Sequence, residues 1–296
     1  MFQIIKNLLK KEKIVKKPVH TFEMYLDLKA GGVSSTLYHQ GYREAVFMYI
    51  VETTVKPGMI CFDLGANIGY VTLYMLKAIK NNGFVYAIEP DPRNIKLLNM
   101  NIDLNNFSDF CEISQGVIFN KTGKTDFYQA SAPNLSSITK PTSVKERINV
   151  DSYTLDDYFK DRKFPHFIKM DVEGAEIEIL ESSKDFFKKH NENTNILMEV
   201  HQKYYHNNNL SDTFANILRD YFKIGFKPKY IVSTPVSIPE AFAKAGYTPS
   251  KTFQTDGRER GLFENVKEED FISFACFRHV EGDAERIARS IMISRD

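Results

Sequence analysis

A short turn with two glycines is the part of the sequence that most directly suggests chemistry. The stretch CFDLGANIGY, residues 61–70, runs from apolar residues into Asp63 and then Gly65 and Gly69. A strand that ends in such a turn and opens a helix commonly presents its backbone N–H groups to a ligand. A dinucleotide fingerprint would need glycine where Asn67 stands, and no Gly-Lys-Ser/Thr ending of a Walker loop follows. The turn therefore predicts a ligand without phosphates, with Asp63 placed to receive a cationic amine.

A second acid follows at the end of the next apolar run. Glu89 closes FVYAIEP, residues 84–90, and comes twenty-four residues after Gly65. One carboxylate at the end of a neighbouring strand can accept hydrogen bonds from both ribose hydroxyls. A cofactor that combines a ribose, an ammonium group and no pyrophosphate fits S-adenosylmethionine.

Two later apolar runs also end in residues that can move a proton. Asp171 and Glu173 close HFIKMDVEG, and His201 closes NILMEVH. Side chains of these types can remove a proton from a reacting group, and histidine has the side-chain pKa nearest neutrality. We therefore expect the catalytic base among His201, Asp171 and Glu173, with Asp171 an alternative ligand of the cofactor amine. A structural role stays open for His201, and Glu173 and Glu176 could instead favour the start of the next helix.

The same region allows a metal site as an alternative. Asp171 and Glu173, and likewise Glu199 and His201, are spaced by two residues, so each pair could face one side of its strand. Neighbouring strands would bring the pairs together in an oxygen-rich set that suits Mg²⁺, Mn²⁺ or Ca²⁺. A site without metal is the expectation, and a chelator separates the two.

These residues need a fold that gathers strand ends. Apolar runs that predict strands alternate with helical patterns: strands at 59–65, 84–90, 110–119, 166–174, 195–201 and 271–278, and helices at 70–79, from Asp91 onward, at 175–181 and at 212–222. Buried strands that alternate with helices predict a mostly parallel sheet covered on both faces, with ligands at the carboxyl ends of the strands. Asp63, Glu89, Asp171 and His201 should then share one rim.

Two stretches interrupt this alternation, and one precedes it. Residues 129–145 form a Ser/Thr/Pro-rich segment that we expect to cover the substrate, since loops of this length are uncommon without a role. Residues 226–263 have little periodicity and could shape the substrate side. Residues 1–50 are interpreted as a helical extension, and residues 51–296 as the main domain. The Lys-rich residues 2–17 predict a solvated helix, with weak contact to an anionic membrane as the alternative.

Composition excludes several classes of function. Lys and Arg number 39 and Asp and Glu 38, so the net charge of +1 gives no general attraction to nucleic acid. Three cysteines in apolar runs favour reduced thiols over a disulfide framework. No apolar run approaches the roughly 18 residues that span a bilayer, and no secretory signal is present, so a cytoplasmic protein is expected.

Four motifs in order resemble the FkbM family of S-adenosylmethionine-dependent methyltransferases. They are DLGANIGYVTL, YAIEPDPRNIKLLNMNI, TLDDYF and FIKMDVEGAEIEIL, and the resemblance spans roughly residues 38–201. It implies an α/β, Rossmann-like class I methyltransferase fold, with a mostly parallel seven-stranded sheet and helices on both faces. One antiparallel strand is implied at the C-terminal edge, for which 271–278 is the candidate.

The resemblance also implies roles for individual residues. It places Asp63, Gly65, Ala66, Asn67 and Gly69 around the methionine part of the cofactor, Glu89 and Pro90 at the ribose, and Gly116 and Val117 beside the adenine. The implied reaction transfers methyl to a hydroxyl of a sugar, a glycan or a glycosylated metabolite and yields S-adenosylhomocysteine. N- or carboxyl-methylation, or a non-catalytic cofactor-binding module, are the alternatives, because fold and cofactor do not fix the acceptor.

Overall fold

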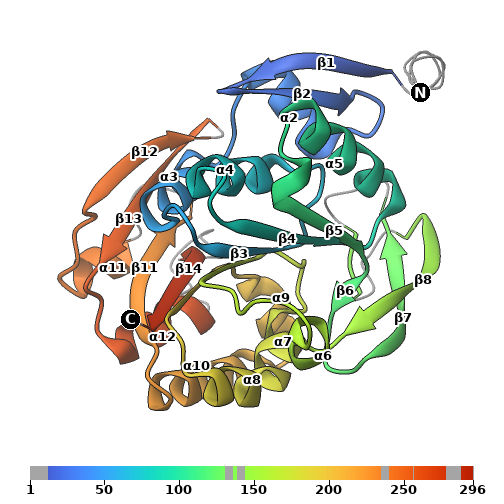
Figure 1. The fold of residues 1–296 in the computed structure, drawn as a ribbon. Coiled ribbons are helices and arrows are strands. Elements are labelled where there is room, and N and C mark those ends of the chain that lie inside the picture. The colour runs from blue at the N-terminus through green and yellow to red at the C-terminus, as the bar shows by residue number, and fades with distance from the viewer. Residues whose placement is uncertain are drawn as a thin grey trace.

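A nine-stranded sheet forms the centre of the computed structural model, which describes residues 13–130, 136–138, 144–234, 240–255, 257–277 and 288–295 (Figure 1). Its strand order is β12-β13-β11-β14-β10-β9-β3-β4-β5. The parallel half consists of β3 (Ile60–Leu64), β4 (Phe84–Glu89), β5 (Cys111–Gln115), β9 (Phe167–Met170) and β10 (Thr194–Glu199). The other half consists of β11 (Lys227–Ser233), β12 (Lys251–Thr255), β13 (Arg258–Glu264) and β14 (Ala288–Arg295). The predicted parallel, doubly covered α/β fold is confirmed, with nine strands in place of seven.

The antiparallel strand is where the prediction from sequence is wrong. The apolar run at residues 271–278 predicts that strand, but most of this run belongs to helix α12 (Glu268–Cys276). The antiparallel strand is β14, and it lies inside the sheet between β10 and β11 instead of at an edge. The helix is apolar on nearly every side because it packs against both the sheet and helix α10 (Ser211–Lys223), so periodicity alone could not separate it from a strand.

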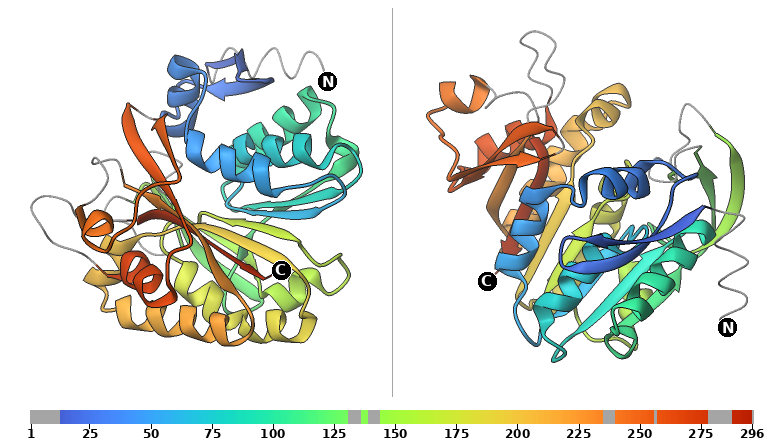
Figure 2. Two further views of the ribbon diagram at one scale, coloured as in Figure 1. Left: turned by 90° about the vertical axis from the view of Figure 1, so that its left-hand side faces the viewer. Right: turned by 90° about the horizontal axis from the view of Figure 1, so that it is seen from above.

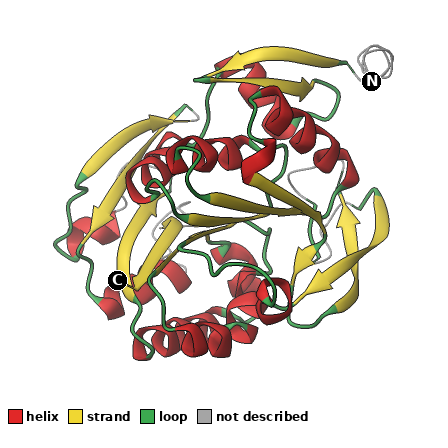
Figure 3. Ribbon diagram, viewed as in Figure 1, coloured by secondary structure: helices red, strands yellow, loops and turns green. Residues whose placement is uncertain are grey.

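Helices cover both faces of the sheet (Figure 3). One face carries α3 (Ala45–Thr54), α4 (Tyr70–Ile79) and α5 (Pro92–Leu104), which share one apolar core with the N-terminal hairpin and the sheet. The opposite face carries α6 (Leu155–Phe159), α7 (Glu176–Ser182), α8 (Lys184–His190), α9 (Gln202–Asn207), α10 and α12. As predicted, α4 spans residues 70–79, and Asp91 caps α5 by accepting a hydrogen bond from the N–H of Arg93.

The N-terminal region differs from the expected helical extension. A hairpin of β1 (Ile14–Val19) and β2 (Phe22–Asp27) precedes α2 (Gly32–Gln40), because the alternate residues Phe22, Met24 and Leu26 are buried, which is the two-residue period of a strand. These side chains join the same core as α4. The predicted boundary at residue 51 falls inside α3, so it does not separate two domains. The predicted helix at residues 2–17 is wrong where the structure describes it, because residues 14–17 belong to β1; residues 1–12 lie outside the described residues.

A three-stranded side sheet flanks the parallel edge (Figure 2). It consists of β6 (Val117–Ile118), β7 (Gly123–Gln129) and β8 (Glu146–Tyr153). The strand predicted at 110–119 is therefore two strands, β5 and β6, which separate at Gly116. A side chain there would place its Cβ 2.8 Å from the carbonyl oxygen of Asp151, so glycine lets the chain pass close to β8. The short helix α11 (Glu240–Lys244) and the 3₁₀ turn Ser108–Phe110 complete the described elements.

Candidate active site

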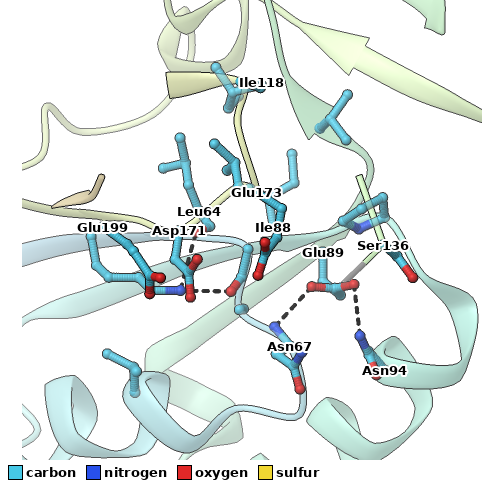
Figure 4. Close-up of a pocket in the computed structure, with 18 of the residues that line it drawn as sticks. Leu64, Asn67, Ile88, Glu89, Asn94, Ile118, Ser136, Asp171, Glu173 and Glu199 are labelled. Carbon is cyan, nitrogen blue, oxygen red and sulfur yellow. Dashed lines mark hydrogen bonds between the residues drawn. The ribbon is translucent and has the colours of Figure 1, made fainter. Parts of the chain in front are cut away.

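A cavity of about 270 Å³ opens at the carboxyl ends of β3, β4, β9 and β10 (Figure 4). Most of the predicted site residues line it: Gly65, Ala66, Asn67, Glu89, Pro90, Gly116, Val117, Asp171, Glu173, Glu199 and His201. Asp63 and Gly69 do not. Parallel strands end on the same side of a sheet, and this gathers residues that lie more than one hundred positions apart in the sequence.

Glu89 forms one end of the cavity and is held by the turn that follows β3. Its Oε2 accepts a hydrogen bond of 2.9 Å from the N–H of Asn67, and its Oε1 accepts from the N–H of Asp91 at 3.0 Å and from Asn94 Nδ2 at 3.1 Å. Burial raises the pKa of the Glu89 carboxyl to about 7, against the effect of these three donors. A carboxylate has about four acceptor positions, so Oε2 retains one that faces a ligand.

Asp63 does not line the cavity, which differs from its predicted contact with the cofactor. Its side chain is fully buried, its Oδ2 accepts a 2.7 Å hydrogen bond from Thr72 Oγ1, and its Oδ1 lies 3.2 Å from Lys169 Nζ. Lys169 also donates to the carbonyl oxygen of Gly65 at 2.7 Å and lines the cavity. Lys169 was not among the predicted site residues, although one lysine inside the apolar run FIKM indicated a buried ion pair.

The two glycines of the turn serve packing. Gly65 has φ +75°, and a Cβ there would lie 2.1 Å from the carbonyl oxygen of Asp171, so only glycine allows the two loops to meet. Gly69, at φ +89°, precedes the first turn of α4, and a Cβ there would lie 2.7 Å from Leu98 Cδ1. Gly69 therefore lets α4 and α5 approach each other and takes no place in the cavity wall.

Three carboxylates surround the imidazole of His201. Nδ1 lies 3.0 Å from Glu176 Oε1, and Nε2 lies 3.4 Å from Glu173 Oε2 and 3.7 Å from Glu199 Oε1. Burial alone would lower the pKa of His201, but the charge of Glu176 and the contacts with Glu173 and Glu176 outweigh it and hold that pKa well above 6.5. The imidazole of His201 therefore holds its proton more strongly than a free histidine does.

An alternating row of charges continues from His201 along the cavity wall. Arg289 of β14 forms an ion pair with Glu199 Oε1, and its Nη2 lies 3.7 Å from Glu44 Oε1. Glu44 is also paired with Arg43. Burial and the charge of Asp171 raise the pKa of Glu199 to about 8, although Arg289 opposes them. Burial disfavours the Glu44 carboxylate as well, yet the two arginines lower its pKa to about 2.

Backbone strain is concentrated at the same cavity. Glu44, Asn67 and Glu173 all have left-handed backbone conformations, with φ of 50°, 51° and 53°. Asparagine tolerates this region, but a glutamate in it is uncommon and carries a cost of order 1–3 kcal/mol. Strain of this kind clusters at functional sites, which supports the assignment of this cavity as the active site.

The two predicted substrate segments behave differently. Within 129–145, Ser136 and Ile138 line the cavity, and Ser137 Oγ donates a 2.8 Å hydrogen bond to the carbonyl oxygen of Glu173; residues 131–135 and 139–143 lie outside the described chain. No described residue of 226–263 lines the cavity. That segment instead contacts the residue next to Glu44 in the cavity wall, because Thr255 Oγ1 accepts a 2.9 Å hydrogen bond from the N–H of Ala45.

The predicted metal ligands are only partly gathered. Asp171, Glu173 and His201 each offer a ligand atom, and these atoms lie within 4.8 Å of one another. Glu199, the fourth predicted ligand, is paired with Arg289. Metal binding therefore remains a hypothesis about three side chains.

Solved structures of methyltransferases are similar to this chain only at a distance. The FkbM methyltransferase from Methylobacillus flagellatus KT is 18% identical over 70% of this chain and 43% of its own length, with a TM-score of 0.41. This chain thus spans less than half the length of that protein. Fibrillarin from Aeropyrum pernix, solved with natively bound S-adenosyl-L-methionine, is 12% identical over 86% of this chain and 88% of its own, with a TM-score of 0.39.

The precorrin-6y C5,15-methyltransferase from Geobacter metallireducens is 10% identical over 86% of this chain and 90% of its own, with a TM-score of 0.41. Curated proteins gave no match. The family model of the methyltransferase FkbM domain matches residues 63–228 of this chain, which is more than half of its 296 residues. That match includes the turn after β3, Glu89 and the Asp171–His201 cluster, and it establishes that the chain belongs to the FkbM methyltransferase family.

Proposed function

We propose that this protein is an S-adenosylmethionine-dependent O-methyltransferase that acts on a hydroxyl of a sugar, a glycan or a glycosylated metabolite. The observation that carries the proposal is a single cavity with the Glu89 carboxylate at one end and the His201 cluster at the other. Family membership supports methyl transfer as the chemistry.

The residues present fit this cofactor. Acidic and basic side chains both line the cavity, so it can accept a cofactor that carries an ammonium group and a carboxylate. The Oδ1 of Asp171 is buried and has no hydrogen-bond partner among the described residues, so it can accept from an ammonium group. Glu89 would hold the ribose through its remaining acceptor position.

When bound, S-adenosylmethionine supplies a methyl carbon that is activated by the sulfonium. The chain's own contribution is alignment, exclusion of water and removal of the acceptor proton. Nε2 of His201 is the atom we assign to that proton, after His201 has lost its own. Glu173, whose Oε2 lies 3.4 Å from Nε2, is placed to receive that proton.

The polar wall favours a hydroxyl acceptor. Arg43, Glu44, Glu199 and Arg289 provide charged hydrogen-bonding groups beside His201, as binding of a polyol requires. Amine and carboxylate acceptors, and a module that binds the cofactor without turnover, are the alternatives that the acceptor experiment tests.

Calorimetry with S-adenosylmethionine, followed by turnover of labelled cofactor with neutral sugars, glycans, amines and carboxylic acids, tests the proposal. We expect binding by the wild type, at least tenfold weaker binding by Glu89→Ala, and unchanged binding by Glu259→Ala, which removes an exposed carboxylate on β13. Absence of cofactor binding would overturn the proposal. Transfer to amines or acids alone would overturn its hydroxyl specificity.

We also propose that transfer needs no divalent metal, because Glu173 already contacts His201 and Glu199 is paired with Arg289. Turnover should be unchanged after dialysis against a chelator and after addition of Mg²⁺ or Mn²⁺. Loss of turnover that Mg²⁺ restores would instead assign a metal to Asp171, Glu173 and His201.

The cytoplasmic location and the absence of a nucleic-acid partner stay predictions from composition. Within the described residues, none of the helices has the length and apolar character needed to cross a bilayer.

A further inference from the structure

We propose that Glu176 is the positioning residue for His201 and that the hydroxyl of Tyr205 fixes Glu176 in turn. This inference rests on the proposed function of the site. The sequence offered another role for Glu176, because it stands at the start of α7, where an acid favours the helix dipole. The contacts of its two carboxylate oxygens show that stabilising the helix is not its whole role.

Both oxygens of Glu176 are engaged by groups from outside the body of α7. Oε1 lies 3.0 Å from His201 Nδ1 and accepts a 3.3 Å hydrogen bond from the N–H of Gly174. Oε2 accepts a 3.0 Å hydrogen bond from the hydroxyl of Tyr205, in α9. Glu176 and Tyr205 are both fully buried, so water does not compete for these contacts.

Because Glu176 is buried, its carboxylate needs the partners that surround it. An isolated carboxylate in an apolar interior is strongly disfavoured, and it persists only where partners compensate for the lost water. Glu176 has its partners in the imidazole, a phenol and a backbone N–H. The charge of His201 keeps the pKa of Glu176 below its usual value despite the burial, so Glu176 is the ionised partner.

The consequence for His201 is a fixed orientation. The two nitrogens of an imidazole are distinct, and the partner of one nitrogen decides which way the other faces and which tautomer the neutral ring adopts. Because Nδ1 lies 3.0 Å from Glu176 Oε1, Nε2 faces Glu173, Glu199 and the cavity. Tyr205, which lies four residues after His201 on the helix that begins there, ties the carboxylate to the same element as the imidazole.

Two variants and a matched control test the inference. Glu176→Gln removes the charge, and Tyr205→Phe removes one hydrogen bond to Glu176 at nearly constant volume. Tyr221→Phe is the control, because Tyr221 is also fully buried and its hydroxyl donates a 2.9 Å hydrogen bond to the carbonyl oxygen of Leu180, away from the site. Both tyrosine variants lose one buried hydrogen bond, so they should lose comparable stability.

The first readout is proton NMR of the protein without cofactor or acceptor. The His201 Nδ1–H should give a downfield, slowly exchanging signal that is absent in His201→Gln. We expect this signal to move or disappear in Glu176→Gln, to shift in Tyr205→Phe and to stay unchanged in Tyr221→Phe. An unchanged signal in Glu176→Gln would overturn the inference.

The second readout compares the change in kcat with the change in the Kd for S-adenosylmethionine. Glu176→Gln and Tyr205→Phe should lower kcat by about tenfold or more and leave the Kd for S-adenosylmethionine within about twofold. Tyr221→Phe should leave kcat unchanged. Equal losses of kcat in the two tyrosine variants would reduce Tyr205 to a packing role. If the wild type failed to bind cofactor, the proposed function would fail, while the NMR comparison would still decide the orientation of His201.

Discussion

At the scale of single residues, Glu89 links cofactor binding to pH. Its carboxyl has a pKa of about 7, chiefly because it is buried. The free protein therefore takes up a proton at Glu89 as pH falls through 7, and the protonated group loses acceptor capacity for a ribose hydroxyl. We expect the affinity for S-adenosylmethionine to be constant above pH 7 and to fall by up to about tenfold for each pH unit below it. Calorimetry at several pH values measures this directly.

The matched variant for that experiment is Glu89→Gln, which keeps the shape of the side chain and removes its titration. Its affinity should be lower than that of the wild type at high pH and nearly independent of pH around neutrality. A pH dependence in the variant that parallels the wild type would place the titrating group elsewhere in the cavity.

His201 gives the opposite prediction for turnover. Because its pKa lies well above 6.5, the imidazole carries a proton at neutral pH and cannot accept another. The fraction of neutral His201 grows as pH rises, so kcat should increase with pH above neutrality and reach a plateau beyond the pKa. Glu173→Gln should move this rise to lower pH, because Glu173 helps to hold the proton on the ring. A flat kcat–pH profile with folded protein would exclude His201 as the base.

The sequence predicts which residues lie at the cavity more readily than it predicts the contacts that each side chain makes. The sequence places Glu89, Asp171 and His201 correctly in the cavity because each closes a parallel strand. Asp63 also closes a strand, yet its side chain faces Thr72 and Lys169. The packing of α4 and β9 around Asp63 decides the direction of its side chain, and no local sequence pattern encodes that packing. The contacts of Arg289 and Glu176 escape prediction for the same reason.

At the scale of elements, short apolar runs predict the regular structure well wherever turn residues bound them. Asp91 and Pro92 indicate the start of α5, and the glycine turn indicates that of α4. The run at 271–278 is ambiguous because a helix buried on most sides has no polar stripe. The acids Glu268, Glu269 and Asp270 in the first turn of α12 are the available signal for a helix.

The turn after β3 gives an element-scale prediction. Gly65→Ala should destabilise the protein by more than about 2 kcal/mol, because the new Cβ meets the Asp171 carbonyl oxygen at 2.1 Å in addition to the strain of φ +75°. Gly257→Ala is the control, since Gly257 has φ +71° and a Cβ added there would have no atom within 4 Å. It should cost about 1 kcal/mol. Urea unfolding measures both, and equal losses would mean that close contact with the loop after β9 contributes nothing.

At the scale of the whole molecule, the sheet separates two apolar cores, and the long-range pairings that build it cannot be predicted from the sequence alone. The insertion of β14 between β10 and β11 joins residues about one hundred positions apart, and it brings Arg289 to the cavity. Alternation of strands and helices predicts the parallel half, because strand–helix–strand units favour parallel pairing. The position of β14 depends on contacts with residues that are distant in the sequence, and no local pattern encodes these contacts.

The hairpin and α2 provide the last prediction, which concerns the boundary between extension and domain. Met24, Leu26 and Leu37 are fully buried in the core that also contains α4, and Val33 lines the cavity. A protein that lacks residues 1–43 should therefore expose this core, melt at a lower temperature than the wild type and lose affinity for S-adenosylmethionine. A protein that lacks only residues 1–12 retains every described contact and should match the wild type in both measurements. Wild-type melting and binding by the longer deletion would contradict this prediction, because they would show that the hairpin and α2 add neither core nor cavity wall.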